Sequence, residues 1–150
     1  MRGIRDIRWS DNESKRPGIT DSFDADGNPV EPQRALLRKV LVVDDEQDLA
    51  DMAAALLGAH GLEVVVAYSA YAAMQFLADD REIDAVFSDV VMPGMTGLQM
   101  ADAVREMYPR IKIVLASGYT LPALLANRER PYLYTNKPYK IDTILKLLRS

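Results

Sequence analysis

The 150-residue chain contains no cysteine, which excludes disulfide bonds, thiolate metal sites and thiol catalysis. It also lacks any apolar run near the roughly 20 residues that cross a bilayer, and its N-terminus has no apolar signal-peptide core. The net charge is -4 and the basic residues are scattered, so we predict no direct nucleic-acid binding. These absences favour a cytoplasmic protein without membrane insertion.

With 49% hydrophobic and 27% charged residues, the chain has enough apolar material for one domain with a real core. Residues 1–38 are polar, interrupted by proline and glycine, and show no sustained period, so we predict a flexible N-terminal arm or linker. Within it, residues 24–28 hint at a calcium loop. The glutamate position of such a loop falls on Gln33, which favours a plain turn.

From Lys39 onward, short β-branched runs alternate with helical patterns. We predict strands over residues 40–43, 62–67, 83–88, 111–116 and 132–135, and helices over 45–59, 70–77, 97–107, 121–127 and 141–149. Ser69 should cap the second helix, Gly61 should end the first, and His60 should act in capping there. The apolar face of the first helix is expected to comprise Leu49, Met52, Ala53, Leu56 and Leu57.

Strict alternation of strands and helices predicts a doubly wound α/β sandwich, in which crossover helices cover both faces of a parallel sheet. In such sheets the site lies outside the carboxyl ends of the strands. The residues at these ends are Asp44, Asp45, Asp89, Ser117 and Lys137.

Each of these residues also has a purely structural interpretation, as a cap, a turn former or a solvated charge. Together those interpretations are weaker, because three carboxylates without a cation would repel one another and raise their pKa values. A hard divalent cation relieves the repulsion, and Mg²⁺ prefers oxygen ligands. The sequence therefore predicts a magnesium site.

Residues 39–150 resemble the receiver domain of two-component response regulators. The resemblance rests on four motifs in order: the run 40–46 ending in Asp44-Asp45-Glu46, Asp89 followed by the segment 92–97, the segment 116–118, and Lys137-Pro138. It implies a flavodoxin-like fold with a five-stranded parallel sheet of strand order 2-1-3-4-5, and a receiver domain over residues 39–150.

The resemblance makes Asp89 the phosphoacceptor, which takes a phosphoryl group from a histidine kinase or a histidine phosphotransfer protein. Asp44, Asp45 and Asp89, together with the backbone carbonyl of Val91, are expected to hold Mg²⁺. Lys137 is expected to pair with Asp89 and then with its phosphoryl group.

Ser117 is expected to donate its hydroxyl to a phosphoryl oxygen, and Tyr134 is the expected switch aromatic. The Lys137–Pro138 peptide bond is expected to be cis. Two residues after Asp89 the chain has Val91, where many receivers have a polar side chain that orients the hydrolytic water. With bulky Tyr119 two residues after Ser117, this predicts slow self-dephosphorylation.

We expect a phosphorylation-controlled switch, with no enzyme activity beyond its own phosphorylation and dephosphorylation. Because the chain ends as the last helix finishes, its output is expected to be binding of a downstream protein, through the face of residues 121–127, 132–135 and 141–149, with a homodimer possible. Alternatives are the receiver module of a hybrid histidine kinase, a haloacid-dehalogenase-like phosphatase, and an interaction module independent of phosphorylation. The phosphatase requires a second aspartate where Val91 stands.

Overall fold

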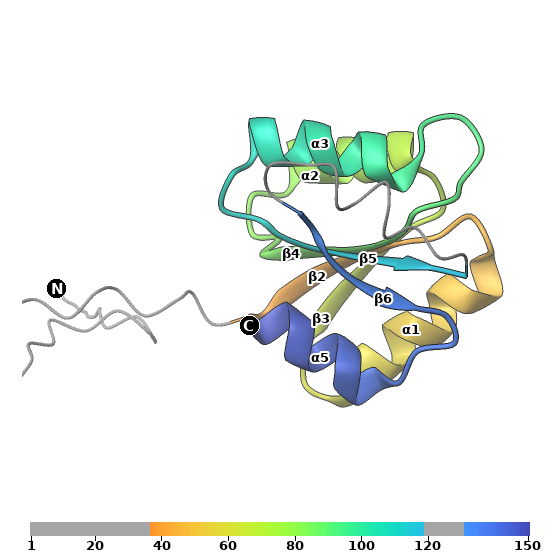
Figure 1. The fold of residues 1–150 in the computed structure, drawn as a ribbon. Coiled ribbons are helices and arrows are strands. Elements are labelled where there is room, and N and C mark those ends of the chain that lie inside the picture. Colours follow the sequence, from red (N-terminus) through yellow and green to blue (C-terminus); the bar gives the residue numbers. More distant parts are fainter. Residues whose placement is uncertain (1–36, 119–130) are drawn as a thin grey trace, which may run out of the picture. The chain divides into compact units, whose positions relative to one another are not determined.

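The structure, a computed structural model, describes residues 37–118 and 131–150. In this part of the chain, β-strands and α-helices alternate along the sequence (Figure 1). The strands are β2 (Lys39–Val43), β3 (Glu63–Ala67), β4 (Ala85–Asp89), β5 (Lys112–Ser117) and β6 (Leu133–Asn136). The helices are α1 (Gln47–Ala59), α2 (Ala70–Asp79), α3 (Gly97–Met107) and α5 (Ile141–Arg149).

The strands form one parallel sheet in the order β3-β2-β4-β5-β6. In order along the chain this is 2-1-3-4-5, so the predicted fold class and strand order are confirmed. Val43 of β2 is in register with Ser88 of β4, and Asp89 with Ala116 of β5. The residues that follow β2 and those that end β4 and β5 therefore share one edge of the sheet.

Helices α2 and α3 cover one face of the sheet, and α1 and α5 cover the other (Figure 1). A separate apolar cluster lies under each pair of helices. Every residue of β4 is buried, because this strand lies inside the sheet and has helices on both faces. A carboxylate at the end of β4 is thus held by a fully packed strand.

Helix ends follow the predicted chemistry. The Ser69 hydroxyl accepts the backbone N–H of Ala72 at 3.0 Å, which confirms this cap of α2. Thr96 and Gln99 form a reciprocal capping box at the start of α3. Gly61 follows α1 with a positive φ of 91°, the backbone conformation in which glycine is least strained.

The predicted apolar face of α1 is partly wrong. Ala53 and Leu57 are buried, but Leu49, Met52 and Leu56 are exposed. The third buried residue of α1 is Ala50, an alanine outside the predicted face. The helix is buried through two alanines and Leu57, and its other large apolar residues lie toward solvent.

Two smaller predictions need correction. Helix α1 begins at Gln47, two residues later than predicted, with Glu46 as its N-cap. Tyr132, which lies in the segment 132–135 expected to belong to the binding face, is buried.

The expected arm is a prediction that the structure does not test, since residues 1–36 lie outside the described residues. The same holds for the turn at 24–28 and the helix at 121–127. Among the helices that are described, none is long and apolar enough to span a membrane.

Candidate functional site

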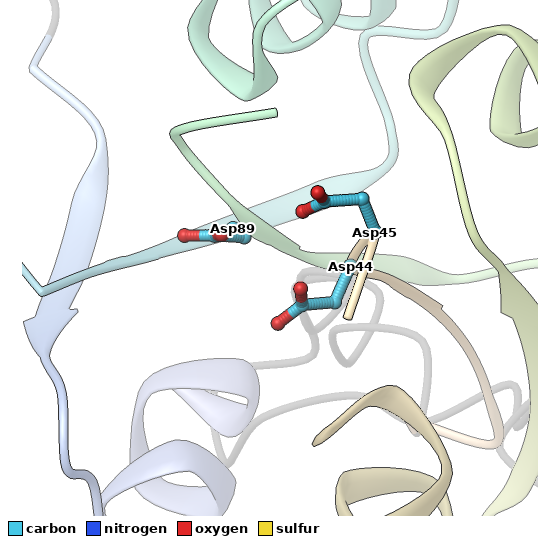
Figure 2. Close-up of side chains that lie close together, drawn as sticks. All are labelled: Asp44, Asp45 and Asp89. Atoms are coloured by element: carbon cyan, nitrogen blue, oxygen red, sulfur yellow. The ribbon is translucent and has the colours of Figure 1, made fainter. Parts of the chain in front are cut away.

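Three carboxylates converge at the carboxyl edge of the sheet. Asp44 and Asp45 follow β2, and Asp89 is the last residue of β4. One oxygen from each lies within 4.8 Å of the others, and the three carboxylates point in the same direction (Figure 2). Asp44 and Asp89 are buried, whereas Asp45 is exposed. The group therefore has two fixed carboxylates and one at the solvent side.

Lys137 provides the positive charge beside this cluster. Its Nζ lies 3.2 Å from Asp44 Oδ2 and 3.4 Å from Asp89 Oδ2. The other oxygen of Asp44, Oδ1, accepts the backbone N–H of Glu46 at 2.9 Å. Asp44 is thus held from two sides, and it fixes the ammonium group of Lys137 next to Asp89.

Burial is the main cause of the unusual electrostatics of Asp89. It raises the pKa of the carboxyl, the charge on Asp44 adds to the rise, and Lys137 and the backbone N–H of Val91 oppose it. For Lys137, burial lowers the pKa, but the charges of Asp89 and Asp44 outweigh burial and raise it overall. The site thus combines a carboxyl group whose ionisation is disfavoured with an ammonium group whose protonation is favoured.

Ser117 and Lys137 come together through the backbone. Ser117 ends β5 and is buried, and its carbonyl accepts the backbone N–H of Lys137 at 2.8 Å. The Lys137–Pro138 peptide bond is cis, as expected. Tyr134 on β6 lies in register with Leu115 on β5 and is 37% exposed. Four of the predicted strand ends therefore meet at one edge, with Tyr134 three residues before Lys137.

Val91 and Tyr119 are the two residues predicted to tune dephosphorylation. Val91 lies two residues after Asp89 and is 53% exposed. Tyr119 lies outside the described residues.

Tyr139 lines a small pocket that also includes Asp44 and Asp89. Its ring meets Phe87 edge to face, with centroids 5.1 Å apart. Burial raises the pKa of the Tyr139 hydroxyl, against the opposing effect of Lys137. The pocket is lined by Val42, Val43, Asp44, Leu49, Ala50, Phe87, Asp89, Ala116, Lys137 and Tyr139. Most of the lining residues are apolar, so the charged groups of Asp44, Asp89 and Lys137 border a largely apolar pocket.

Sequence reasoning missed two residues that position Asp89. The hydroxyl of Ser88 donates to the backbone carbonyl of Asp89 at 2.8 Å. Gly97 packs on the same carbonyl, and its backbone N–H donates to the carbonyl of Val90 at 2.8 Å. A buried hydroxyl inside an apolar strand was the available signal for Ser88, whereas Gly97 was noted only as part of the motif after Asp89.

Comparison with known proteins agrees with this arrangement. Residues 40–149 match the family model described as the response regulator receiver domain. The chain belongs to this receiver-domain family. Receiver domains are signalling switches and are generally not classed as enzymes. The family typically binds Mg²⁺ at an acidic pocket and interacts with histidine kinases.

Two curated relatives illustrate the contexts of similar receiver domains. The response regulator protein FleR of Pseudomonas aeruginosa is 35% identical over 112 residues, which cover 73% of this chain and 24% of FleR. The sensor kinase CckA of Brucella abortus is 28% identical over 146 residues, which cover 89% of this chain and 15% of CckA. The chain spans about a quarter of the length of the first curated relatives it matches.

Two solved structures are similar over nearly their whole length. The chemotaxis protein CheY4 of Vibrio cholerae has a TM-score of 0.69 and 30% identity, with 75% of this chain and 97% of CheY4 covered. The response regulator TrrA of Thermotoga maritima, solved in complex with Mg²⁺-BeF, has a TM-score of 0.65 and 26% identity. Coverage is 74% of this chain and 99% of TrrA.

Proposed function

We propose that this receiver domain accepts a phosphoryl group on Asp89 from a phosphohistidine of a histidine kinase or phosphotransfer protein. The observation that carries the proposal is the ion pair of Asp89 with Lys137 beside two further carboxylates. A nucleophilic carboxylate, a cation for the phosphoryl oxygens and a group of metal ligands are the parts that phosphoryl transfer needs.

In the proposed step, a carboxylate oxygen of Asp89 attacks the phosphorus of the phosphohistidine. A P–O bond forms while the P–N bond breaks, and the imidazole of the partner leaves with the bonding electron pair. Lys137 then turns from the carboxylate to the phosphoryl oxygens and neutralises part of their charge. Asp44 keeps the ammonium group within reach, because it holds the same Nζ at 3.2 Å.

The donor set fits Mg²⁺, a hard cation that prefers oxygen ligands and retains several waters. Asp44, Asp45 and Asp89 would hold the ion together with the backbone carbonyl of Val91. When bound, the ion supplies positive charge to the phosphoryl oxygens in the transition state. The TrrA structure with Mg²⁺-BeF supports this assignment by similarity.

The signal after phosphorylation is proposed to pass through Ser117 and Tyr134. The Ser117 hydroxyl would bond a phosphoryl oxygen and draw the start of the following loop toward Asp89, and Tyr134 would then turn inward. This changes the surface offered to a downstream protein in the cytoplasm. Val91 and Tyr119 would make the phosphorylated state long-lived.

A second candidate context is the receiver module of a hybrid histidine kinase. The similarity to the sensor kinase CckA covers 89% of this chain and therefore reaches into residues before the family match at 40. In that context residues 1–38 would be a linker from the preceding part of the kinase. The chemistry proposed for Asp89 is the same in both contexts.

Incubation of the chain with a small phosphodonor and Mg²⁺, followed by intact mass measurement, tests the function. We expect a gain of one phosphoryl group in the wild-type chain, no gain in Asp89→Asn and a much smaller gain in Lys137→Met. An equal gain in Asp89→Asn would contradict the proposal. Turnover of a generic phosphate ester would instead favour the phosphatase alternative, which Val91 disfavours because it has no acidic side chain.

A further inference from the structure

Helix α3 begins directly against the proposed phosphoacceptor. A Cβ on Gly97 would lie 1.9 Å from the backbone oxygen of Asp89, so the start of the helix packs against this carbonyl with no room for a side chain. The hydrogen bond from Gly97 to the carbonyl of Val90 joins the two segments a second time. A displacement of the backbone after Asp89 must therefore be followed by the start of α3.

Farther along its length, α3 contacts a buried tyrosine, Tyr132, which has no role in the proposed chemistry. The hydroxyl of Tyr132 donates to Asp102 Oδ1 at 2.6 Å. Arg105, one turn later on α3, lies over the Tyr132 ring with its Cζ 3.8 Å from the ring centroid. Tyr132 is only 4% exposed and belongs to the apolar cluster under α2 and α3. Two contacts with α3 thus hold this side chain, which is also buried in the apolar cluster.

Tyr132 immediately precedes β6, the strand that carries Tyr134 and leads to Lys137. In an extended chain, residues two apart point to the same face, so Tyr132 and Tyr134 both face the α3 side of the sheet. Tyr132 therefore sets where β6 begins relative to α3. The path from Asp89 through Gly97 and α3 to Tyr132 consists of direct contacts and one rigid helix.

We infer that Tyr132 is a positioning residue that couples the backbone around Asp89 to strand β6 through its hydrogen bond with Asp102. This inference rests on the proposed function, because it concerns how β6 responds when the site is occupied. It adds a route to Tyr134 that is separate from the Ser117 hydroxyl. A rigid helix fixed at both ends transmits a shift only if the contact at each end persists.

The test uses the full 150-residue chain with Mg²⁺ and fluoroberyllate, a tetrahedral mimic of an aspartyl phosphoryl group. Amide chemical shifts of residues 90–97 report the site, and those of residues 133–136 report β6. The variants are Tyr132→Phe, which keeps the ring over which Arg105 lies, and Asp102→Ala, which removes the acceptor of the Tyr132 hydroxyl. Tyr68→Phe is the matched control, because the Tyr68 hydroxyl donates to Asp51 at 2.7 Å on the opposite side of the sheet from α3.

In the wild-type chain both groups of amides should shift. In Tyr132→Phe the shifts of residues 90–97 should persist, while those of 133–136 should fall by about threefold, the size of change typical for a broken coupling contact. Asp102→Ala, which removes the acceptor of the same hydrogen bond, should behave in the same way and decides the question if Tyr132→Phe does not fold. The control Tyr68→Phe should match the wild type.

Wild-type shifts at residues 133–136 in both Tyr132→Phe and Asp102→Ala would overturn the coupling role and leave the proposed function intact. An absence of shifts at residues 90–97 in the wild-type chain would instead contradict the proposed function and the inference with it. An equal loss in Tyr68→Phe would show a general effect of removing a tyrosine hydroxyl, which also overturns the inference.

Discussion

Gly97 lies against Asp89 so closely that a Cβ atom would come within 1.9 Å of the Asp89 carbonyl oxygen and 2.9 Å of its carbonyl carbon. Both of these are backbone atoms, which cannot move aside as the end of a flexible side chain can. Glycine is therefore required at the start of α3 for a reason of space. Its φ is not in the left-handed region, so conformational freedom is not the cause.

We predict that Gly97→Ala lowers the free energy of unfolding by about 2 kcal/mol or more, because overpacking forces backbone shifts. It should also slow phosphorylation, since the shift falls on the residue that carries the nucleophile. Urea unfolding and the phosphodonor assay measure the two effects. The matched control is Gly58→Ala in α1, where a Cβ meets nothing within 4 Å. That change should stabilise the helix by about 0.5 kcal/mol.

Asp89→Asn should make the protein more stable at neutral pH in the absence of Mg²⁺. Burial raises the pKa of Asp89, so its ionisation opposes folding. The cost is fully present above the folded-state pKa and disappears as the pH falls toward the unfolded-state value near 3.9. Lys137 keeps a partner in the variant, because Asp44 lies 3.2 Å from its Nζ.

The measurement is urea unfolding of both proteins at pH 7 and at pH 4, with chelator present. The stability advantage of Asp89→Asn at pH 7 should shrink at pH 4. An advantage that grows toward acid pH would show that the folded state lowers the pKa of this carboxyl, contrary to the effect of its burial.

The order of elements and the capping residues follow from sequence because they depend on local chemistry. Ser69 and Gly61 act at helix ends through their own side chain or backbone. Which residues of α1 are buried does not follow from the sequence, since apolar residues occupy most of the circumference of this helix. Only the side of the helix that packs on the sheet decides that Ala50 is buried and Met52 is 59% exposed.

The candidate site could be predicted to the extent that its residues end parallel strands. Asp44, Asp89 and Lys137 meet because the sheet brings these ends to one edge. Contacts between side chains of segments that are far apart in the chain leave no comparable pattern in the sequence. Tyr132 and Tyr134 look alike in sequence, yet one is buried against α3 and the other is 37% exposed.

Magnesium should stabilise the folded protein, and Asp45 should be needed for this effect. A ligand that binds only the folded state adds about 2.7 kcal/mol at a concentration of 100 times its Kd. Asp45 is the exposed member of the cluster and makes a smaller contribution to the core than Asp44. Asp45→Asn should therefore remove most of the magnesium effect with little change in stability without the ion.

Thermal unfolding with increasing MgCl₂ measures this effect. Asp48→Asn, one residue into α1 and also exposed, is the control for general screening of negative charge. An equal loss of the magnesium effect in both variants would indicate nonspecific binding to the acidic start of α1 and not a site built around Asp45.

Val91 should set the lifetime of the phosphorylated state. Val91 is 53% exposed and lies two residues after the proposed nucleophile, and its apolar side chain offers no group that orients water. Val91→Asn supplies a polar side chain there and should speed loss of the phosphoryl group by about tenfold. This is less than the roughly 10²–10⁴-fold of a positioned general acid or base, because an amide orients water without taking its proton. Little stability should be lost, because the replaced side chain is half exposed.

Decay of the phosphorylated mass after removal of the phosphodonor, with Mg²⁺ kept in excess, measures the rate. Val91→Ala separates the two causes, because it removes bulk and adds no polar group. If Val91→Ala decays as fast as Val91→Asn, shielding by the valine controls the lifetime; if only Val91→Asn is faster, orientation of water does. Wild-type rates in both variants would show that position 91 has no part in hydrolysis, and the slow decay expected of this chain would then need another cause.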